Sequence, residues 1–384
     1  MIYLDHAATT RPYAAVIDYI TKQAEEDFFN PAAAYRPAIR VEKQINRSLQ
    51  QIGSTIGAKA AELIVTSGAT ESINTVFKGY CPLKKRQGTH LVICSGDHPA
   101  TLESAAYMES LGWTVHRLPL APTGEPDLAA LEVVLKQVGD SVVLVSLPAV
   151  NNETGAVTPL SEVRAQLDHL APAAALHVDC VQAWTRLPLD LGTTGIDFAS
   201  FSGHKIGGPK RIGLLYMRSG LRLEPLLHGG GQQKGRRSGT EAAVPVAALA
   251  LAAEIGNRER EEDFLYVQDL RKSFLQGLTA AGLVFRVNAS ETAIPHILSV
   301  SFPGIRGETL LHMLEDREIY LSTGSACGAG KKTVSHVLRA LNLSHELALG
   351  TVRLSFSREN TAAEIAEAVR AVKSGVEALT ALRQ

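Results

Sequence analysis

Residues 175–182, ALHVDCVQ, begin as a short apolar run and end in polar residues. A run that is apolar on both faces is typical of a strand in a parallel sheet covered by helices. Similar runs are LIVTS (63–67), HLVICS (90–95), WTVHRL (113–118), VVLVSL (142–147), FASFS (198–202) and GLLYM (213–217). Helical patterns at 99–111, 127–137 and 159–170 lie between them. This alternation predicts an α/β fold with a mostly parallel, seven-stranded sheet.

The pattern changes after residue 243. The stretch VPVAALALAAEIGNRERE (244–261) predicts a long helix that leaves the sheet domain. Shorter apolar runs and helical patterns then alternate up to a C-terminal amphipathic helix. We therefore expect a large domain at 13–255 and a smaller α+β domain formed by 1–12 and 256–384.

Composition narrows the class of protein. The 384 residues carry a net charge of −1, which gives no reason to expect nucleic acid or an anionic membrane as a direct partner. No apolar run reaches the length of a membrane span, and MIYLDHAATT lacks the basic start of a signal peptide. Four cysteines without paired spacing favour a reducing compartment, so we expect a cytoplasmic protein. No metal site is expected.

Small residues follow the strand at 63–67. Gly68, Ala69 and Thr70 stand where a helix should start, and backbone N–H groups there could approach an anion. A simple capping turn is the alternative. No GxGxxG or P-loop motif occurs in the chain, so a bound phosphate would belong to a ligand other than NAD or ATP.

Two further strand ends carry chemically useful side chains. Asp179 ends an apolar strand, where a carboxylate is costly unless it is paired. It either caps a neighbouring loop or balances a buried cation. Lys205 follows the strand at 198–202 and has glycines on both sides, and a lysine amine readily forms a Schiff base. Pyridoxal phosphate would use an anion cradle, a ring-facing acid and such a lysine together.

Several motifs strengthen this interpretation. They are YLDHAATT (3–10), TSGATES (66–72), VNNETG (150–155), HVDCVQ (177–182), SFSGHKIGGPKRIG (200–213), HGGGQQKGRRSGTE (228–241), STGSACGAG (322–330), VLRALNL (337–343) and TVRLSFS (351–357). In this order they resemble the cysteine desulfurases of the NifS/IscS type. These are pyridoxal-phosphate enzymes of the class V aminotransferase fold, a fold-type I architecture. The resemblance extends from Tyr3 to Arg358.

The resemblance implies a role for each matching residue. Lys205 would hold the cofactor covalently, Asp179 would pair with its ring nitrogen, and Gln182 would bond its ring hydroxyl. The other cofactor contacts would be Ala69, Thr70, Ser202 and His204, with Thr240 reaching the cofactor of the neighbouring subunit in a homodimer. His98 would stack on the ring and assist proton transfer, although a surface turn is the plainer role for this histidine. Asn152 and Arg353 would bind the substrate carboxylate, unless Arg353 forms a structural salt bridge.

Cys327 lies in a run of Gly, Ser and Ala that can bury very little, although unpaired cysteines are usually buried. In the family that the chain resembles, such a cysteine attacks the substrate sulfur. The implied reaction converts L-cysteine to L-alanine and leaves a persulfide on Cys327. A sulfur-acceptor protein of unknown identity would then receive sulfur for iron–sulfur clusters or thiolated products. A selenocysteine lyase, another class V aminotransferase or lyase, and a catalytically idle scaffold are the alternatives.

Overall fold

The computed structural model describes residues 1–326 and 333–382. All seven predicted strands join one sheet, which confirms the predicted fold class. The strands are β2 (Leu63–Thr66), β3 (His90–Cys94), β4 (Thr114–Leu118), β5 (Val142–Pro148), β6 (Ala175–Asp179), β7 (Phe198–Ser202) and β8 (Gly213–Met217).

The sheet has the strand order β2-β8-β7-β6-β5-β3-β4. Strands β7, β6, β5, β3 and β4 pair in parallel, and β8 runs antiparallel to both of its neighbours. Strand β2 therefore points the same way as β7. The carboxyl ends of six strands meet at one edge, which is where ligands bind in open α/β sheets.

Helices cover both faces of this sheet because the strand side chains alternate. Leu63 and Val65 belong to a core that also contains buried residues of α1, α2, α5, α6 and the first half of α7. Ile64 faces the opposite core, under α3 and α4. The helices are α1 (Ala14–Glu26), α2 (Arg36–Ile56), α3 (Ala69–Thr75), α4 (Pro99–Ser110), α5 (Leu128–Val138), α6 (Leu160–Leu170) and α7 (Ala243–Ala280).

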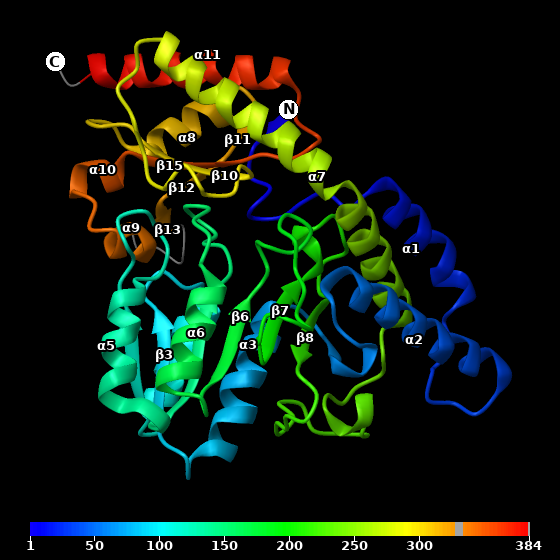
Figure 1. Cartoon of the computed structure of the whole chain (residues 1–384). Helices are drawn as coiled ribbons and strands as arrows, with labels where there is room; N and C mark the ends of the chain where they lie inside the picture. The colour runs from blue at the N-terminus through cyan, green and yellow to red at the C-terminus, as the bar shows by residue number, and fades with distance from the viewer. Residues whose placement is uncertain (327–332, 383–384) are drawn as a thin grey trace.

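A separate hydrophobic core holds the rest of the chain. The antiparallel sheet β12-β15-β10-β9 packs with α8, α11 and the second half of α7. These elements are β9 (Arg286–Val287), β10 (Ile297–Ser301), α8 (Gly307–Glu315), β12 (Ser322–Thr323), β15 (Thr351–Ser355) and α11 (Ala362–Ala381). Figure 1 shows α8 and α11 at the end of the molecule opposite α3 and α5.

Short elements complete the chain. They are β1 (Ile2–Tyr3), which pairs with β11 (Ile319–Tyr320), then β13 (Ser325–Ala326) with β14 (Thr333–Val334), and the helices α9 (His336–Ala340) and α10 (His345–Leu349). The N-terminal segment therefore joins the second core, through β1 and the buried Leu4.

Helix α7 links the two cores and packs against α1, α2 and α11 (Figure 1). Its buried side chains belong to the first core up to Ala253 and to the second from Val267 onward. The boundary expected at 255 falls inside this helix. The division into domains at 13–255 and at 1–12 with 256–384 stays a proposal.

Candidate active site

A cavity of about 970 Å³ opens at the carboxyl edge of the large sheet. Ten of the twelve predicted site residues line it: Ala69, Thr70, His98, Asn152, Asp179, Gln182, Ser202, His204, Lys205 and Arg353. They come from the ends of β2, β3, β5, β6 and β7 and from β15 in the second core. The fold thus brings together residues that are up to 284 positions apart, from Ala69 to Arg353.

The other two predicted residues lie elsewhere. Thr240 is exposed, outside this cavity, in the segment that precedes α7 and beside Gln233 and Arg237. Its predicted contact is with a second subunit, so the role stays a prediction. Cys327 lies outside the described residues.

Asp179 is the last residue of β6. Its Oδ1 accepts a hydrogen bond of 3.0 Å from the Val181 N–H. Burial raises the pKa of Asp179 above its usual range, while this hydrogen bond and the charges of His98 and Lys205 act against the rise. A desolvated carboxylate that lines a cavity is suited to balance a cation bound there.

Lys205 follows β7 in a short 3-10 turn, Gly203–Lys205. Its Nζ donates to two carbonyl oxygens, of Ala7 at 2.6 Å and of Ala8 at 2.7 Å. Burial, with the positive charges of Arg353 and Arg186, lowers the pKa of Lys205 to about 8. An amine with this pKa is substantially neutral near pH 8, which nucleophilic attack on an aldehyde requires.

His98 caps the N-terminus of α4. Its Nδ1 accepts a hydrogen bond of 3.1 Å from the Ala100 N–H. The ring proton of neutral His98 is therefore on Nε2. Burial lowers the pKa of His98, although the charge of Asp179 acts against this. His98 thus enters the cavity as a neutral ring with one N–H donor.

The predicted anion cradle lies at the start of α3. Gly68 has φ +150°, and a Cβ there would lie 3.6 Å from Ser202 Oγ. Glycine at 68 therefore leaves the space between the first helical turn and β7 open. The first N–H groups of a helix have no partner within it and can bind an anion. His204 lies beside Ser202, where its Nδ1 is 3.1 Å from Thr9 Oγ1.

Arg353 comes from the middle of β15. Its Nη2 donates to Asp5 Oδ1 at 2.8 Å and to Ser322 Oγ at 3.0 Å, and its Nη1 donates to the Asn152 carbonyl at 3.0 Å. Nε of Arg353 is buried and has no partner among the residues that the structure describes. The salt bridge that the sequence left as an alternative is present, and one buried N–H remains free for an anion.

The N-terminal segment contributes groups that our sequence analysis missed. Asp5 holds Arg353, and the Ala7 carbonyl accepts from both Lys205 Nζ and Gln182 Nε2. The YLDHAATT motif suggested that this stretch matters, but a backbone carbonyl has no sequence signature.

Two other polar contacts were also missed. His177, fully buried in β6, bridges Ser146 Oγ at 2.7 Å and Ser200 Oγ at 2.8 Å. Ser335 Oγ donates to Glu153 Oε1 at 2.7 Å, which joins α9 to the loop that carries Asn152. A histidine within an apolar strand was the available signal for the first contact.

Comparisons with known proteins show which family the chain resembles. A family model described as aminotransferase class-V matches residues 2–367. The cysteine desulfurase IscS of Methanosarcina thermophila is 33% identical over 380 residues, which cover 98% of this chain and 92% of that protein. A solved NifS-like protein has a TM-score of 0.91 at 32% identity, with 98% of this chain and 99% of that chain covered. For SspA in complex with cysteine the TM-score is 0.80 at 29% identity, with 93% and 99% covered.

This chain belongs to the class V aminotransferases, a family of pyridoxal-phosphate enzymes, and within it to the cysteine desulfurases of the NifS/IscS type. Within residues 1–326 and 333–382, no helix is long and apolar enough to cross a membrane. The same residues contain no group of three or more His, Cys, Asp or Glu side chains that could hold a metal ion.

Proposed function

We propose that this chain is a pyridoxal-phosphate cysteine desulfurase that converts L-cysteine and the Cys327 thiol to L-alanine and a Cys327 persulfide. The observation that carries the proposal is the cavity of about 970 Å³, which is lined by an amine, a half-buried carboxylate, a capping histidine and an arginine whose Nε has no partner among the described residues. The structure of SspA in complex with cysteine supports the choice of substrate.

The residues present fit the cofactor. Lys205 supplies the amine that would attach it, and the start of α3 with Ser202 and His204 would bind its phosphate. Asp179 would face the ring nitrogen, where a cation offsets the cost of burying the carboxylate. When bound, pyridoxal phosphate supplies an electron sink for the bonds at the substrate α-carbon.

The chain's own groups would then bind the substrate and move protons. Arg353, whose Nε has no partner in residues 1–326 and 333–382, and Asn152 would hold the substrate carboxylate. Lys205, once displaced by the substrate amine, would carry the α-proton. His98 has its Nδ1 engaged by the Ala100 N–H, so its Nε2–H would act as a hydrogen-bond donor toward the ring or the substrate.

Cys327 is our candidate for the sulfur-accepting thiol, because the chain's other cysteines are unsuited to the role. Cys81, Cys94 and Cys180 are fully buried. Burial raises the pKa of each of these three thiols well above its usual range. The thiolate is the reactive form of cysteine, so these side chains would be inert.

Mass spectrometry of the persulfide tests this proposal. After incubation of the purified holoenzyme with L-cysteine, we expect one added sulfur on the peptide that contains Cys327, and one L-alanine for each sulfur. Cys327→Ala should keep the visible absorbance of the bound cofactor and form no persulfide. The matched control, Cys180→Ala, should still add sulfur at Cys327. Added sulfur on Cys81, Cys94 or Cys180, or wild-type alanine formation by Cys327→Ala, would contradict the proposal.

We further propose a homodimer with composite sites, in which Thr240 reaches the cofactor of the partner subunit. A sulfur-acceptor protein would then take the sulfur to iron–sulfur clusters or thiolated products. Pull-down from the native host, followed by persulfide transfer to each captured candidate, would identify it.

A further inference from the structure

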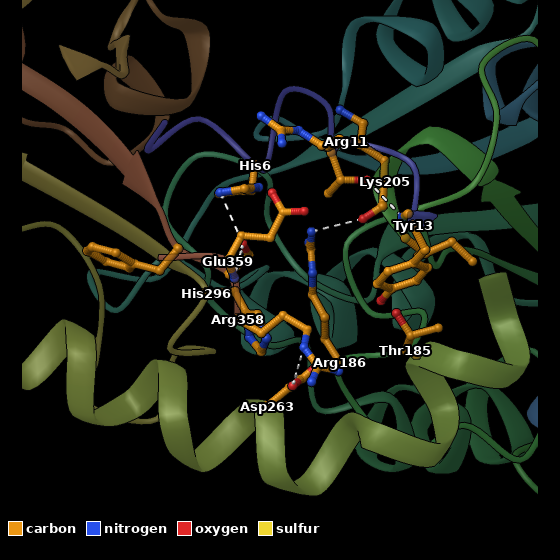
Figure 2. A pocket seen from close by; sticks show the side chains of 16 residues that line it. His6, Arg11, Tyr13, Thr185, Arg186, Lys205, Asp263, His296, Arg358 and Glu359 are labelled. Atoms are coloured by element: carbon orange, nitrogen blue, oxygen red, sulfur yellow. Dashed lines mark hydrogen bonds and ion pairs between the residues drawn. The ribbon is translucent and has the colours of Figure 1, made fainter. Parts of the chain in front are cut away.

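Arg186 lies next to the candidate catalytic lysine, Lys205. Arg186 is 7% exposed and, together with Lys205, lines a second, smaller cavity (Figure 2). Its Nη2 donates to the Lys205 carbonyl at 3.2 Å. Its Nη1 donates to the Gln182 carbonyl at 3.3 Å and, in a short contact, to Gln182 Oε1.

The surroundings of Arg186 are unusual for a buried arginine. In the described parts of the chain, Arg186 has no carboxylate within ion-pair distance, and the nearby Arg358 pairs with Glu259 and Asp263. Within the described residues, every hydrogen bond that Arg186 donates ends on a neutral oxygen of Gln182 or Lys205. A buried charge without a counter-ion is costly. Burial accordingly lowers the pKa of Arg186 to about 10.

These contacts fix how Gln182 presents its amide. A guanidinium has donors only, so the Gln182 atom that faces it must be Oε1. The Nε2 group therefore points the other way, and one of its hydrogens reaches the Ala7 carbonyl at 3.0 Å. The second hydrogen remains for the large cavity, which Gln182 also lines. Toward a bound ligand, Gln182 can therefore only donate.

Arg186 also adds positive charge at Lys205. The other charged groups that act on this lysine are Arg353, Asp5 and Asp179. His98 and His204 lie close enough to be influenced by its charge. Because Arg186 holds the Lys205 carbonyl, it fixes the backbone that carries the amine as well as the electrostatics around it.

We propose that Arg186 is a positioning residue that locks Gln182 as a donor to the ring hydroxyl of the cofactor and destabilises positive charge at Lys205. This inference rests on the proposed function, since it requires pyridoxal phosphate at Lys205. The Gln182 amide, as a donor, would stabilise the ionised form of the ring oxygen. The positive charge of the Arg186 guanidinium would favour the same ionised oxygen and would also favour the deprotonated form of the Lys205 nitrogen that attaches the cofactor. Without Arg186, the cofactor would bind but would titrate at a higher pH.

The test is a pH titration of the visible absorbance of holoenzyme. Arg186→Met keeps much of the side-chain length but removes the positive charge and the hydrogen-bond donors. Arg186→Lys keeps the charge but removes the planar guanidinium that holds Gln182. We expect the titration midpoint of Arg186→Met to rise by about one pH unit and that of Arg186→Lys to rise by less. The kcat of both variants should fall at neutral pH, with a smaller change in KM. Arg358→Met is the matched control in the same small cavity, and its midpoint should stay at the wild-type value.

The outcomes separate this inference from the proposed function. Wild-type protein without a cofactor band that depends on Lys205 would overturn both. If the wild-type protein shows the Lys205-dependent cofactor absorbance, and its titration midpoint is unchanged in Arg186→Met, only the inference about Arg186 is overturned. If Arg186→Met does not fold, the test rests on Arg186→Lys. A titration midpoint and a kcat equal to those of the wild type in Arg186→Lys would contradict the inference.

Discussion

Asp5 and Arg353, 348 residues apart, form an ion pair of 2.8 Å at the edge of the candidate active site. The side chain of Asp5 is 18% exposed and that of Arg353 is 12% exposed. The pair leaves Arg353 Nε unpartnered in the described structure, so Asp5 aims the guanidinium without using all of its donors.

Asp5→Asn should therefore weaken substrate binding more than it slows turnover. A hydrogen bond to a charged group contributes roughly 1.5–3 kcal/mol, and 1.4 kcal/mol corresponds to a factor of about ten, so we expect KM for L-cysteine to rise about tenfold. Steady-state kinetics measures this. Ser322→Ala removes the other side-chain partner of Arg353 and should have a smaller effect. An unchanged KM in Asp5→Asn would show that Asp5 does not position the arginine.

The pKa of Lys205 predicts how cofactor attachment depends on pH. Burial lowers this pKa from 10.5 to about 8, so the neutral amine forms as the pH rises through 8. The rate at which cofactor-free protein gains visible absorbance with pyridoxal phosphate should rise up to about pH 8 and then level off. Stopped-flow absorbance measures this rate, and Lys205→Arg should form no band at any pH. A rate that still climbs toward pH 10.5 would rule out the lowered pKa.

Buried His177 should make the fold sensitive to acid. Burial lowers its pKa from 6.5 to about 3. Above pH 6.5 the ring is neutral in both the folded and the unfolded chain; as the pH falls from 6.5 toward 3, only the unfolded chain takes up the proton. Folding stability is therefore lost in this window, by about 2 kcal/mol between pH 6.5 and 5 for this residue.

Urea unfolding of His177→Asn at pH 7.5 and pH 5 tests this assignment. The variant should be less stable than the wild type at pH 7.5, because it loses hydrogen bonds to Ser146 and Ser200. Its stability should also change less between the two pH values. The exposed His312 provides the control, since His312→Ala should keep the wild-type pH dependence. Equal pH dependence in His177→Asn and the wild type would assign the acid sensitivity to other groups.

The exposed Thr240 provides a test of composite sites. Thr240→Ala should weaken binding of pyridoxal phosphate, and Lys205→Ala should prevent its covalent attachment. A mixed dimer of these two variants would contain one site with both residues intact. The isolated mixed dimer should therefore bind cofactor with wild-type affinity at one of its two sites. If the mixed dimer shows no site with wild-type affinity for pyridoxal phosphate, Thr240 acts within its own subunit's site or at no cofactor site.

The sequence by itself was sufficient to predict the large sheet. The runs at 63–67, 90–95, 113–118, 142–147, 175–180, 198–202 and 213–217 all became strands of that sheet, because a strand that is apolar on both faces can be buried only between layers of helices. Asp179, which ends β6, and Lys205, which follows β7, were visible for the same reason. A charged residue is conspicuous in an apolar context.

Only the tertiary structure shows which groups contact Lys205, Arg353 and Arg186. The Ala7 and Ala8 carbonyls that receive the Lys205 amine lie about 200 positions away, and backbone oxygens have no sequence signature. The pairing of Asp5 with Arg353 depends on the N-terminal segment crossing to the second core. Arg186 appears in the sequence as an ordinary charged residue between two apolar stretches. Arg186 is buried without a counter-ion among the described residues, and it bonds Gln182 and Lys205, because the loop after β6 folds against the segment that carries the lysine. Desolvation there strengthens those hydrogen bonds.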